Sequence, residues 1–216
     1  MIDDIEDLKI YFYDSFLSTE QINEIKAVNG YSETALGETI LSTGVGQGGY
    51  DHFYYNNKIF NPKFSDLIFK LRISDLTDVK AFIGFRSNIT APDINMVESH
   101  VGILIWQVAG ATKIYFSSAD GTNQQKVELE GLNMEDVYEF KLSFDKLYFK
   151  PLPQVESYLG MPTIKRVERV YTLLQQNSTW TAEDQVHWIA LYIENTTNAE
   201  RLIYLNRIIY KEEYAD

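Results

Sequence analysis

Three glycines in the N-terminal quarter of the chain have the spacing of a dinucleotide-binding loop. Gly44, Gly46 and Gly49 form the pattern G-x-G-x-x-G within the segment LSTGVGQGGYDHFYYNN. Such a loop binds pyrophosphate only where a helix begins directly after it, because the helix N-terminus holds the phosphate. Here the aromatic segment from Tyr50 to Tyr55 follows, which is typical of a strand. The glycines therefore predict a flexible hairpin loop and no nucleotide site.

The residues that most often bind transition metals are few and scattered. The chain contains no cysteine, so neither disulfides nor thiolate metal sites are available. His52, His100 and His187 stand singly along the chain, and a metal site would need them to converge in space. We expect isolated histidines at the surface or at strand ends.

The charge of the chain limits its partners. The formal net charge of -12 at pH 7 argues against binding of nucleic acid, which requires a basic surface. No apolar run approaches the roughly 18 residues that span a bilayer. The acidic N-terminal segment MIDDIEDLKIYFYDSF lacks the basic and apolar regions of a signal peptide. We expect a location on a virion or at the cell exterior if the protein is viral, and otherwise in the cytoplasm.

Short segments of alternating or continuous apolar residues, separated by turn residues, predict strands along most of the chain. The content of 15 Tyr and 12 Phe supports this, because these residues favour strands. The expected strands cover residues 8–16, 50–55, 67–73, 79–85, 101–108, 113–116, 126–129 and 137–144, and a hairpin at 142–149. Residues 164–174 have apolar residues at helical spacing, but their Val, Tyr and Thr content favours a strand. Regular short strands without alternating long helices predict an antiparallel all-β sandwich of two sheets, formed as one domain by residues 1–216.

Two segments depart from the strand pattern, so one or two short helices are expected. In residues 18–28, Ile22, Ile25 and Val28 recur three apart, and Ser18 with Gln21 has the spacing of a capping box. This predicts a short helix. Residues 151–162, which contain several prolines, predict a long loop or a short helix that crosses between the sheets.

The segment His187–Glu213 contains two further strands joined by the polar corner 195–198. Ile189, Leu191 and Ile193 share one face of the first strand, and Trp188 with Tyr192 lies on the other. Neither face is polar, so both faces are expected to be covered. We expect these strands to close the fold near the first strand of the chain.

The order of these segments resembles the concanavalin A-like jelly-roll superfamily. The resemblance rests on the YDSF opening, the FSDLIFKLRI, AFIGFRSN and VGILIW strands, the YEFKLSFDKLYFKP hairpin and the closing LIYLNRIIY strand. It spans almost the whole chain, although a viral jelly roll of different topology could have a similar sequence. The resemblance implies a jelly-roll β-sandwich related to lectins, laminin-G-type modules, polysaccharide lyases and glycoside hydrolases.

The resemblance also identifies what a catalytic strand would contain. Retaining hydrolases of this fold carry Glu-x-Asp-x-x-Glu, because hydrolysis requires a nucleophile and an acid about 5 Å apart. The nearest string here, EDVYE at 135–139, has a different spacing, so its carboxylates cannot share one face of a strand. In the strand 101–108, Ile103, Ile105 and Gln107 share a face without an acidic pair. We therefore expect a protein that is not an enzyme.

The superfamily implies two kinds of binding residue. Relatives stack aromatic rings on sugars and use amide or carboxylate groups for hydrogen bonds, which singles out Tyr50, Tyr54, Trp106, Gln107 and Trp180. Several relatives hold Ca²⁺ with loop carboxylates, and here Asp14, Asp120 and Asp145 are the candidates, although turn formation also explains the last two.

These observations favour a non-enzymatic structural or attachment module of a virus or phage particle, such as a capsid decoration, turret or fibre protein that also binds glycans. Its expected partners are other subunits of the assembly, including copies of itself, and a glycan. Two alternatives remain open. One is a glycoside hydrolase or polysaccharide lyase whose acidic residues come from separated strands. The other is a cellular glycan-binding protein.

Overall fold

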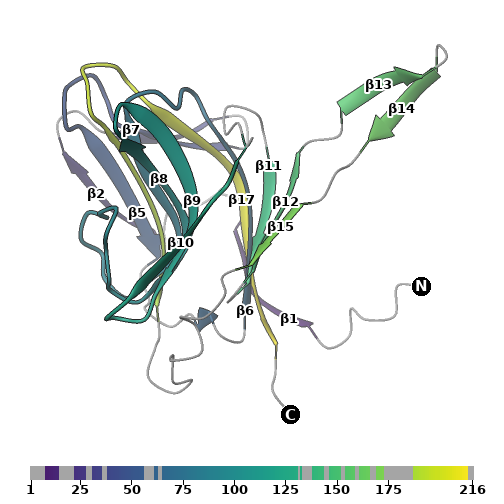
Figure 1. The fold of residues 1–216 in the computed structure, drawn as a ribbon, viewed down its shortest axis with the longest axis horizontal. Helices are drawn as coiled ribbons and strands as arrows, with labels where there is room; N and C mark the ends of the chain where they lie inside the picture. Colours follow the sequence, from purple (N-terminus) through teal and green to yellow (C-terminus); the bar gives the residue numbers. More distant parts are fainter. Residues whose placement is uncertain are drawn as a thin grey trace.

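A computed structural model describes residues 8–14, 22–27, 31–35, 38–55, 61–62, 65–130, 132, 138–143, 146–151, 154–158, 161–165, 169–172 and 187–213. In these ranges the regular structure consists of β-strands, and the chain forms two antiparallel sheets that face each other (Figure 1). The predicted two-sheet, all-β sandwich is confirmed. The prediction that residues 1–216 form a single domain stays a prediction.

The first sheet has eight strands, and the long strand β17 is central to it. In chain order the strands are β1 (Leu8–Asp14), β3 (Tyr31–Ala35), β4 (Glu38–Ser42), β6 (Ser65–Ile73), β11 (Tyr138–Leu142), β12 (Lys146–Pro151), β15 (Arg169–Thr172) and β17 (Leu202–Glu213). Their order across the sheet is β15-β12-β11-β6-β17-β4-β3, and β1 also pairs with β17. The pairing of Phe12 with Tyr210 confirms that the last strand lies beside the first.

The second sheet has seven strands. They are β2 (Ile22–Ala27), β5 (Tyr50–Tyr55), β7 (Val79–Arg86), β8 (His100–Val108), β9 (Ala111–Ala119), β10 (Gln124–Glu128) and β16 (Trp188–Asn195), in the spatial order β10-β9-β8-β7-β16-β5-β2. The two C-terminal strands therefore do not pair with each other. The polar corner after β16 carries the chain from one sheet into the other.

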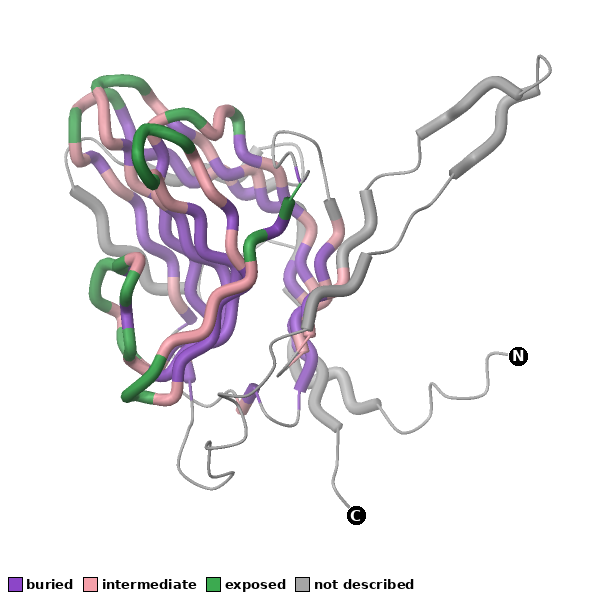
Figure 2. Tube along the Cα trace, in the orientation of Figure 1, coloured by how far each residue is buried: buried purple, intermediate pink, exposed green. Residues whose placement is uncertain are grey.

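The core fills the space between the sheets because side chains alternate along each strand. From β7, Val79, Ile83 and Phe85 point inward and are almost fully buried, and they pack in one cluster with residues such as Phe69 and Leu71 of β6. Figure 2 shows buried segments, in purple, along the strands of both facing sheets. Each such large apolar side chain contributes roughly 1.5–3 kcal/mol by its burial. In β16 the opposite face is also covered, since Tyr192 is buried there. This confirms the expectation that the strand is apolar on both sides.

Two predicted elements are wrong. The helix predicted for residues 18–28 is replaced over 22–27 by the strand β2, which pairs with β5 through partners such as Ile25 and His52. Hydrogen bonds to the open edge of β5 outweigh a weak helical preference in a short segment. The remaining residues of that prediction lie outside the described part.

The predicted loop or short helix at 151–162 contains strand instead. Strands β13 (Gln154–Tyr158) and β14 (Met161–Lys165) form a two-stranded sheet that extends away from the sandwich in Figure 1. Pro162 is tolerated because β14 pairs on one side only, which leaves no missing N–H within a central strand. The predicted hairpin before it is confirmed, since Leu142 pairs with Leu147.

Three connections between the sheets meet at one end of the sandwich. They are the segments 43–49 between β4 and β5, 74–78 between β6 and β7, and 196–201 between β16 and β17. The glycine-rich segment is therefore a crossover between sheets, not the predicted hairpin loop. Gly44 and Gly48 have φ values of 66° and 75°, which favour glycine.

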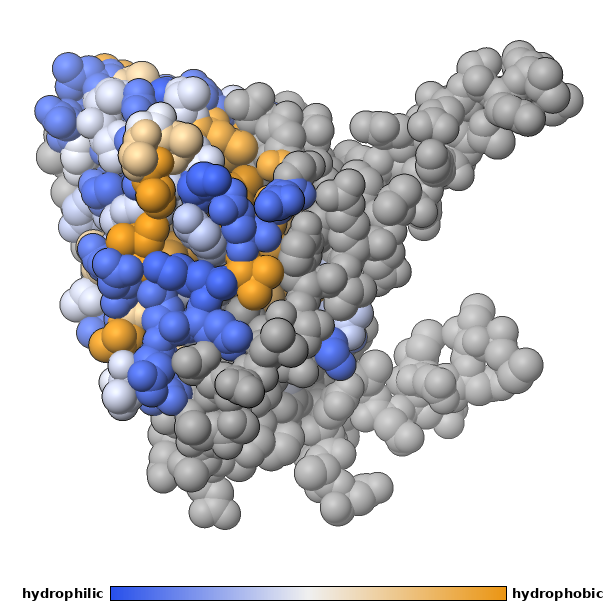
Figure 3. All heavy atoms as spheres, viewed as in Figure 1, coloured by the Kyte–Doolittle hydropathy of each residue, from blue (hydrophilic) through white to orange (hydrophobic). Residues whose placement is uncertain are grey.

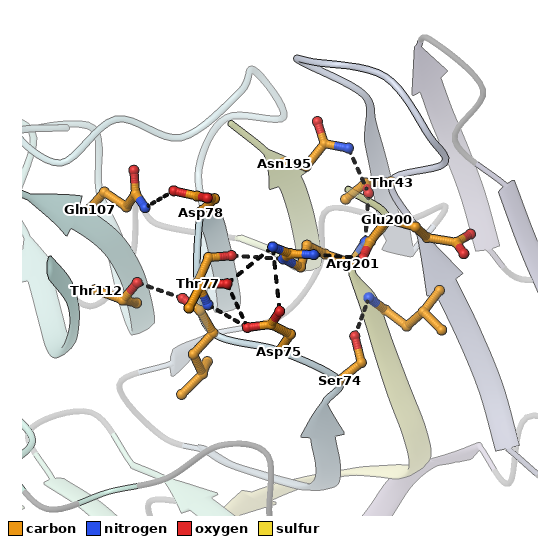
Figure 4. A network of polar contacts seen from close by, with 12 residues as sticks. Thr43, Ser74, Asp75, Thr77, Asp78, Gln107, Thr112, Asn195, Glu200 and Arg201 are labelled. Carbon is orange, nitrogen blue, oxygen red and sulfur yellow. Dashed lines mark hydrogen bonds and ion pairs between the residues drawn. The ribbon is translucent and has the colours of Figure 1, made fainter. Parts of the chain in front are cut away.

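A polar network, buried at Thr43, Asn195 and Arg201 and more exposed at its other members, joins these crossovers (Figure 4). We call it the crossover network, and its members are Thr43, Ser74, Asp75, Thr77, Asp78, Gln107, Asn195 and Arg201. Asn195 donates from Nδ2 to Thr43 Oγ1 and to the carbonyl of Gly44, both at 3.0 Å, and its Oδ1 accepts from the N–H of Gly49 at 3.2 Å. One side chain therefore fixes the crossover 43–49 against the end of β16.

Arg201 joins the other two crossovers. Its Nε donates to the carbonyl of Thr77 at 2.7 Å, and its Nη2 lies 3.4 Å from Asp75 Oδ2. The backbone N–H of Thr77 lowers the pKa of Asp75, and the Thr77 hydroxyl and Arg201 act in the same direction. The ionised carboxylate is thus the favoured partner of Arg201.

We expect Asn195→Ala to lower the free energy of unfolding by about 2–4 kcal/mol, because it leaves buried partners without hydrogen bonds. Denaturant unfolding measures this change. Asn198→Ala is the matched control, since the exposed Asn198 makes one bond to the N–H of Gln47. The control should cost less than about 1 kcal/mol, and equal losses in both variants would contradict the assigned role of Asn195.

Candidate functional site

The outer face of the seven-stranded sheet, opposite the core, carries a row of half-exposed aromatic and charged side chains. Alternation places Tyr50 of β5, Lys80 of β7, Trp106 of β8 and Glu194 of β16 on this face. Together with Tyr192 we call them the Glu194 cluster. Glu194 is directly opposite Tyr50 on one neighbouring strand and Lys80 on the other.

Direct contacts join the members of the Glu194 cluster. Lys80 Nζ donates to Glu194 Oε1 at 2.8 Å, and the Tyr192 hydroxyl donates to Glu194 Oε2 at 2.6 Å. The Lys80 ammonium also lies 5.0 Å from the centre of the Trp106 ring, which is a cation–π distance. Burial, followed by the bond to Glu194, raises the pKa of Tyr192, so its hydroxyl remains a donor.

An aromatic stack extends the cluster along β5. The rings of Tyr50 and Tyr192 stack with centres 5.6 Å apart and planes inclined by 25°. His52 meets Tyr192 edge-on at 5.5 Å, and Tyr54 meets Trp188 edge-on at 6.4 Å. Tyr50 and Tyr54 keep partial exposure, so this face presents flat rings beside charged groups.

The crossover network positions the cluster, because members of the two sets are neighbours in sequence. Asn195 follows Glu194, and Gln107 follows Trp106. Successive side chains point to opposite faces of a strand, so anchoring one residue inward aims its neighbour outward. Gln107 Nε2 donates to Asp78 Oδ1 at 2.6 Å, which fixes the end of β8 against the start of β7.

The other half of this face is closed by the loop 87–99, between β7 and β8, which lies outside the seven-stranded sheet in Figure 1. Arg86 is fully buried, forms an ion pair with Glu98 of the loop, and donates from Nη1 to the carbonyl of Thr90 at 2.6 Å. Lys126 Nζ of β10 donates to the carbonyl of Ile94 at 2.8 Å. The loop is therefore held from both sides.

Apolar contacts complete this closure. Met96 of the loop packs with Phe82, Leu104 and Tyr192. The ring of Phe82 crosses Gly102 so closely that a Cβ there would lie 2.6 Å from it. The open part of the face is therefore the end that carries the Glu194 cluster.

The three histidines are buried, which corrects the expectation of surface positions. His100 and His187 do stand at strand ends, but His52 lies within β5. Burial lowers the pKa of both His52 and His100 to about 3, and the positive charge of Arg86 adds to both shifts. Both rings are therefore neutral near neutral pH, and His100 makes hydrogen bonds to the carbonyl of Glu98 at 2.8 Å and to Ser117 Oγ at 2.9 Å.

Of the three predicted calcium ligands, Asp120 is the one whose side chain lies in the described part of the chain. Asp120 accepts from the N–H groups of Thr122 and Asn123 at 2.9 and 2.8 Å, which is a turn-forming role. Asp14 lies in β1 of the other sheet, its side chain is outside the described residues, and so is Asp145. No three His, Asp or Glu residues among those described could hold a metal together. Calcium binding stays a prediction.

The predicted sugar-binding residues separate into two groups. Tyr50, Tyr54 and Trp106 lie on the one outer face, whereas Gln107 points away from Trp106 into the crossover network. Trp180 lies outside the described residues. Sequence reasoning missed Lys80, Tyr192 and Glu194, because the pairing of β7 with β16 joins residues more than a hundred positions apart. Their outward positions in alternating strands were the available signal.

Among the described residues, the exposed apolar side chains are scattered over the surface. Figure 3 shows hydrophilic residues over much of the described surface in that view, with smaller hydrophobic areas between them. The large apolar side chains that are exposed among the described residues are Val45, Val97 and Val108, which belong to different loops or strand ends. Scattered exposed valines need no functional explanation. No helix in the described part is long and apolar enough to cross a membrane.

No family model and no curated protein matches the chain, but many solved structures do. The catalytic domain of an endo-1,3-beta-glucanase (laminarinase) from Thermotoga petrophila is 12% identical, covers 98% of this chain and 100% of its own, and has a TM-score of 0.60. The Lotus tetragonolobus seed lectin is 9% identical, with 95% and 99% covered and a TM-score of 0.56. The CBM2 module of the evolved Dit of Lactobacillus casei BL23 phage J-1 is 10% identical, with 97% and 98% covered and a TM-score of 0.54.

These likenesses establish the fold, which is the concanavalin A-like jelly roll. The fold that the strand motifs implied is thereby confirmed. At 9–12% identity the neighbours carry no residue roles over to this chain.

The buried histidines predict a loss of stability in acid. The unfolded chain binds a proton at His52 near pH 6.5, and the folded chain only near pH 3, so this contribution is complete above about pH 6.5 and is lost as the pH falls toward 3. In His52→Phe, the slope of the unfolding free energy against pH between pH 6 and 4 should fall by up to about 1.4 kcal/mol per pH unit. Denaturant unfolding at several pH values measures the slope. An unchanged slope would show that His52 titrates normally.

Proposed function

We propose that this chain is a carbohydrate-binding module whose ligand lies on the outer face of the seven-stranded sheet, over the Glu194 cluster. The observation that carries the proposal is the row Tyr50, Glu194, Lys80 and Trp106, in which aromatic rings flank a half-exposed ion pair on one rigid sheet face. Tyr54 lies on the same face, farther along β5, opposite Ala190 of β16. The lectin and the phage CBM2 module among the similar structures support this kind of ligand.

The chemistry of the cluster suits a sugar. A saccharide ring has an apolar face that packs on an aromatic ring and hydroxyl groups that exchange hydrogen bonds with charged side chains. Lys80 supplies donors and Glu194 supplies acceptors within the same few ångströms, since they contact each other at 2.8 Å. A rigid sheet presents these groups without an ordering cost on binding.

Catalysis on this face is the alternative, which the glucanases among the similar structures support. Three carboxylates of this region contact three different cations: Glu98 with Arg86, Glu128 with Lys113, and Glu194 with Lys80. A retaining glycosidase requires two carboxylates about 5 Å apart, and the contacts of these three do not bring any two of them onto a common partner. We therefore favour binding without hydrolysis, and release of reducing sugar from a polysaccharide panel would establish the enzyme instead.

We further propose that the module serves attachment on a virus or phage particle. The phage Dit module supports this, as do the absence of cysteine and the acidic composition. Mass spectrometry of purified particles should find the chain at a copy number that matches a particle symmetry. Its absence from particles, combined with glycan binding, would favour the cellular glycan-binding protein.

We expect Trp106→Ala to weaken binding about ten-fold or more to a polysaccharide that the wild type binds, because a ring-stacking surface is lost. Affinity electrophoresis or calorimetry with a polysaccharide panel measures the change. Tyr204→Ala is the matched control, since Tyr204 packs against Arg72 on the eight-stranded sheet. Equal affinities for wild type and Trp106→Ala, with both folded, would move the binding site elsewhere.

A further inference from the structure

We propose that Glu194 recognises two adjacent hydroxyl groups, a vicinal diol, on the bound saccharide. This inference rests on the proposed function and adds the ligand chemistry and the residue that selects it. It predicts a preference for glycans whose internal units keep two neighbouring free hydroxyls, as 1,4-linked hexoses do. Chains of 1,3-linked glucose lack such a pair in their internal units and should bind poorly.

The acceptor capacity of Glu194 carries the inference. An ionised carboxylate has about four lone-pair positions, two on each oxygen. Lys80 occupies one position on Oε1 and the Tyr192 hydroxyl occupies one on Oε2. One acceptor position remains on each oxygen, and the two oxygens of one carboxylate are spaced to accept from neighbouring hydroxyls together.

The carboxylate is also held in place before any ligand arrives. Tyr192, which is buried, fixes one oxygen, and Lys80 fixes the other while it lies against the Trp106 ring. Asn195, the next residue, is anchored in the crossover network. A group that is already oriented loses less conformational entropy on binding, which favours its use as a specificity element.

Access and flanking rings complete the site. The side chain of Glu194 is 18% exposed and that of Lys80 is 26% exposed, so a ligand can reach both. Neighbouring strands lie about 4.8 Å apart, so Tyr50 stands one strand from Glu194 and Trp106 stands two strands away on the other side. A sugar unit over the carboxylate would therefore have an aromatic ring on each side.

Two other described carboxylates of this region, Glu98 and Glu128, do not share these features. Glu98 is paired with the buried Arg86 in the loop that closes the face. Glu128 is paired with Lys113 at 2.6 Å, and both side chains are more than a third exposed. Glu128 thus carries the same charge as Glu194 and also pairs with a lysine on this sheet, but no hydroxyl among the described residues bonds to it. It therefore provides a matched control.

The test compares Glu194→Gln with Glu128→Gln on soluble 1,4-linked and 1,3-linked glucans, and on the 1,4-linked glucan after periodate oxidation and borohydride reduction. Periodate cleaves the carbon–carbon bond of vicinal diols and leaves isolated hydroxyls intact. We expect Glu194→Gln to lose at least about ten-fold in affinity for the untreated 1,4-linked glucan, because a hydrogen bond to a charged acceptor is lost. Glu128→Gln should bind as wild type does, and wild type should not bind the oxidised glucan.

The outcomes separate this inference from the proposed function. Undiminished binding of wild type to the oxidised glucan, equal affinity for the 1,3-linked glucan, or unchanged affinity in Glu194→Gln would overturn diol recognition. If Trp106→Ala still abolishes binding in that case, the proposed binding face stands. Failure of the wild type to bind any polysaccharide of a broad panel would overturn the proposed function itself. Thermal unfolding of each variant confirms that it is folded.

Discussion

The structure depends on the crossover network, which lies at the end of the sandwich where three segments carry the chain from one sheet to the other. Two side chains make most of this network: Asn195 binds the crossover 43–49, and Arg201 binds the crossover 74–78. Both are buried, so their hydrogen bonds are not exchanged with water and their loss would leave polar groups unsatisfied. Burial of the hydrophobic core favours the packing of two sheets in general. The crossover network fixes the positions of the three segments that connect these two sheets.

The crossover network also explains why the candidate binding residues gather at this end. Gly49, Gln107 and Asn195 are held inward, and each is followed or preceded in sequence by a member of the Glu194 cluster that points outward. Because side chains alternate along a strand, residues fixed by the internal network place their sequence neighbours on the outer face. The crossover network thereby orients the side chains of the Glu194 cluster, and recognition of a polyhydroxylated ligand requires such fixed orientation.

The other half of the outer face is covered by the loop 87–99. There the buried guanidinium of Arg86 is compensated by Glu98 and by the carbonyl of Thr90, both contributed by the loop 87–99. A buried charge without such partners would be very costly, so Arg86 and the loop stabilise each other's positions. One sheet face is therefore divided into a closed half with neutral histidines and an open half with an accessible carboxylate.

The sequence by itself determined the fold class, since alternating apolar residues with regular turns allow few alternatives, and it placed most central strands and Tyr50, Tyr54 and Trp106 on strands. It did not determine β2, whose three-residue spacing resembled a helix until the edge of β5 paired with it. The sequence also did not show that Gln107 and Trp106 point to opposite faces of the sheet, or that Lys80 and Glu194 form an ion pair. Those relations depend on which strands become neighbours, and strand pairing over long sequence distances is set by burial and closure of the whole sandwich, not by local preference.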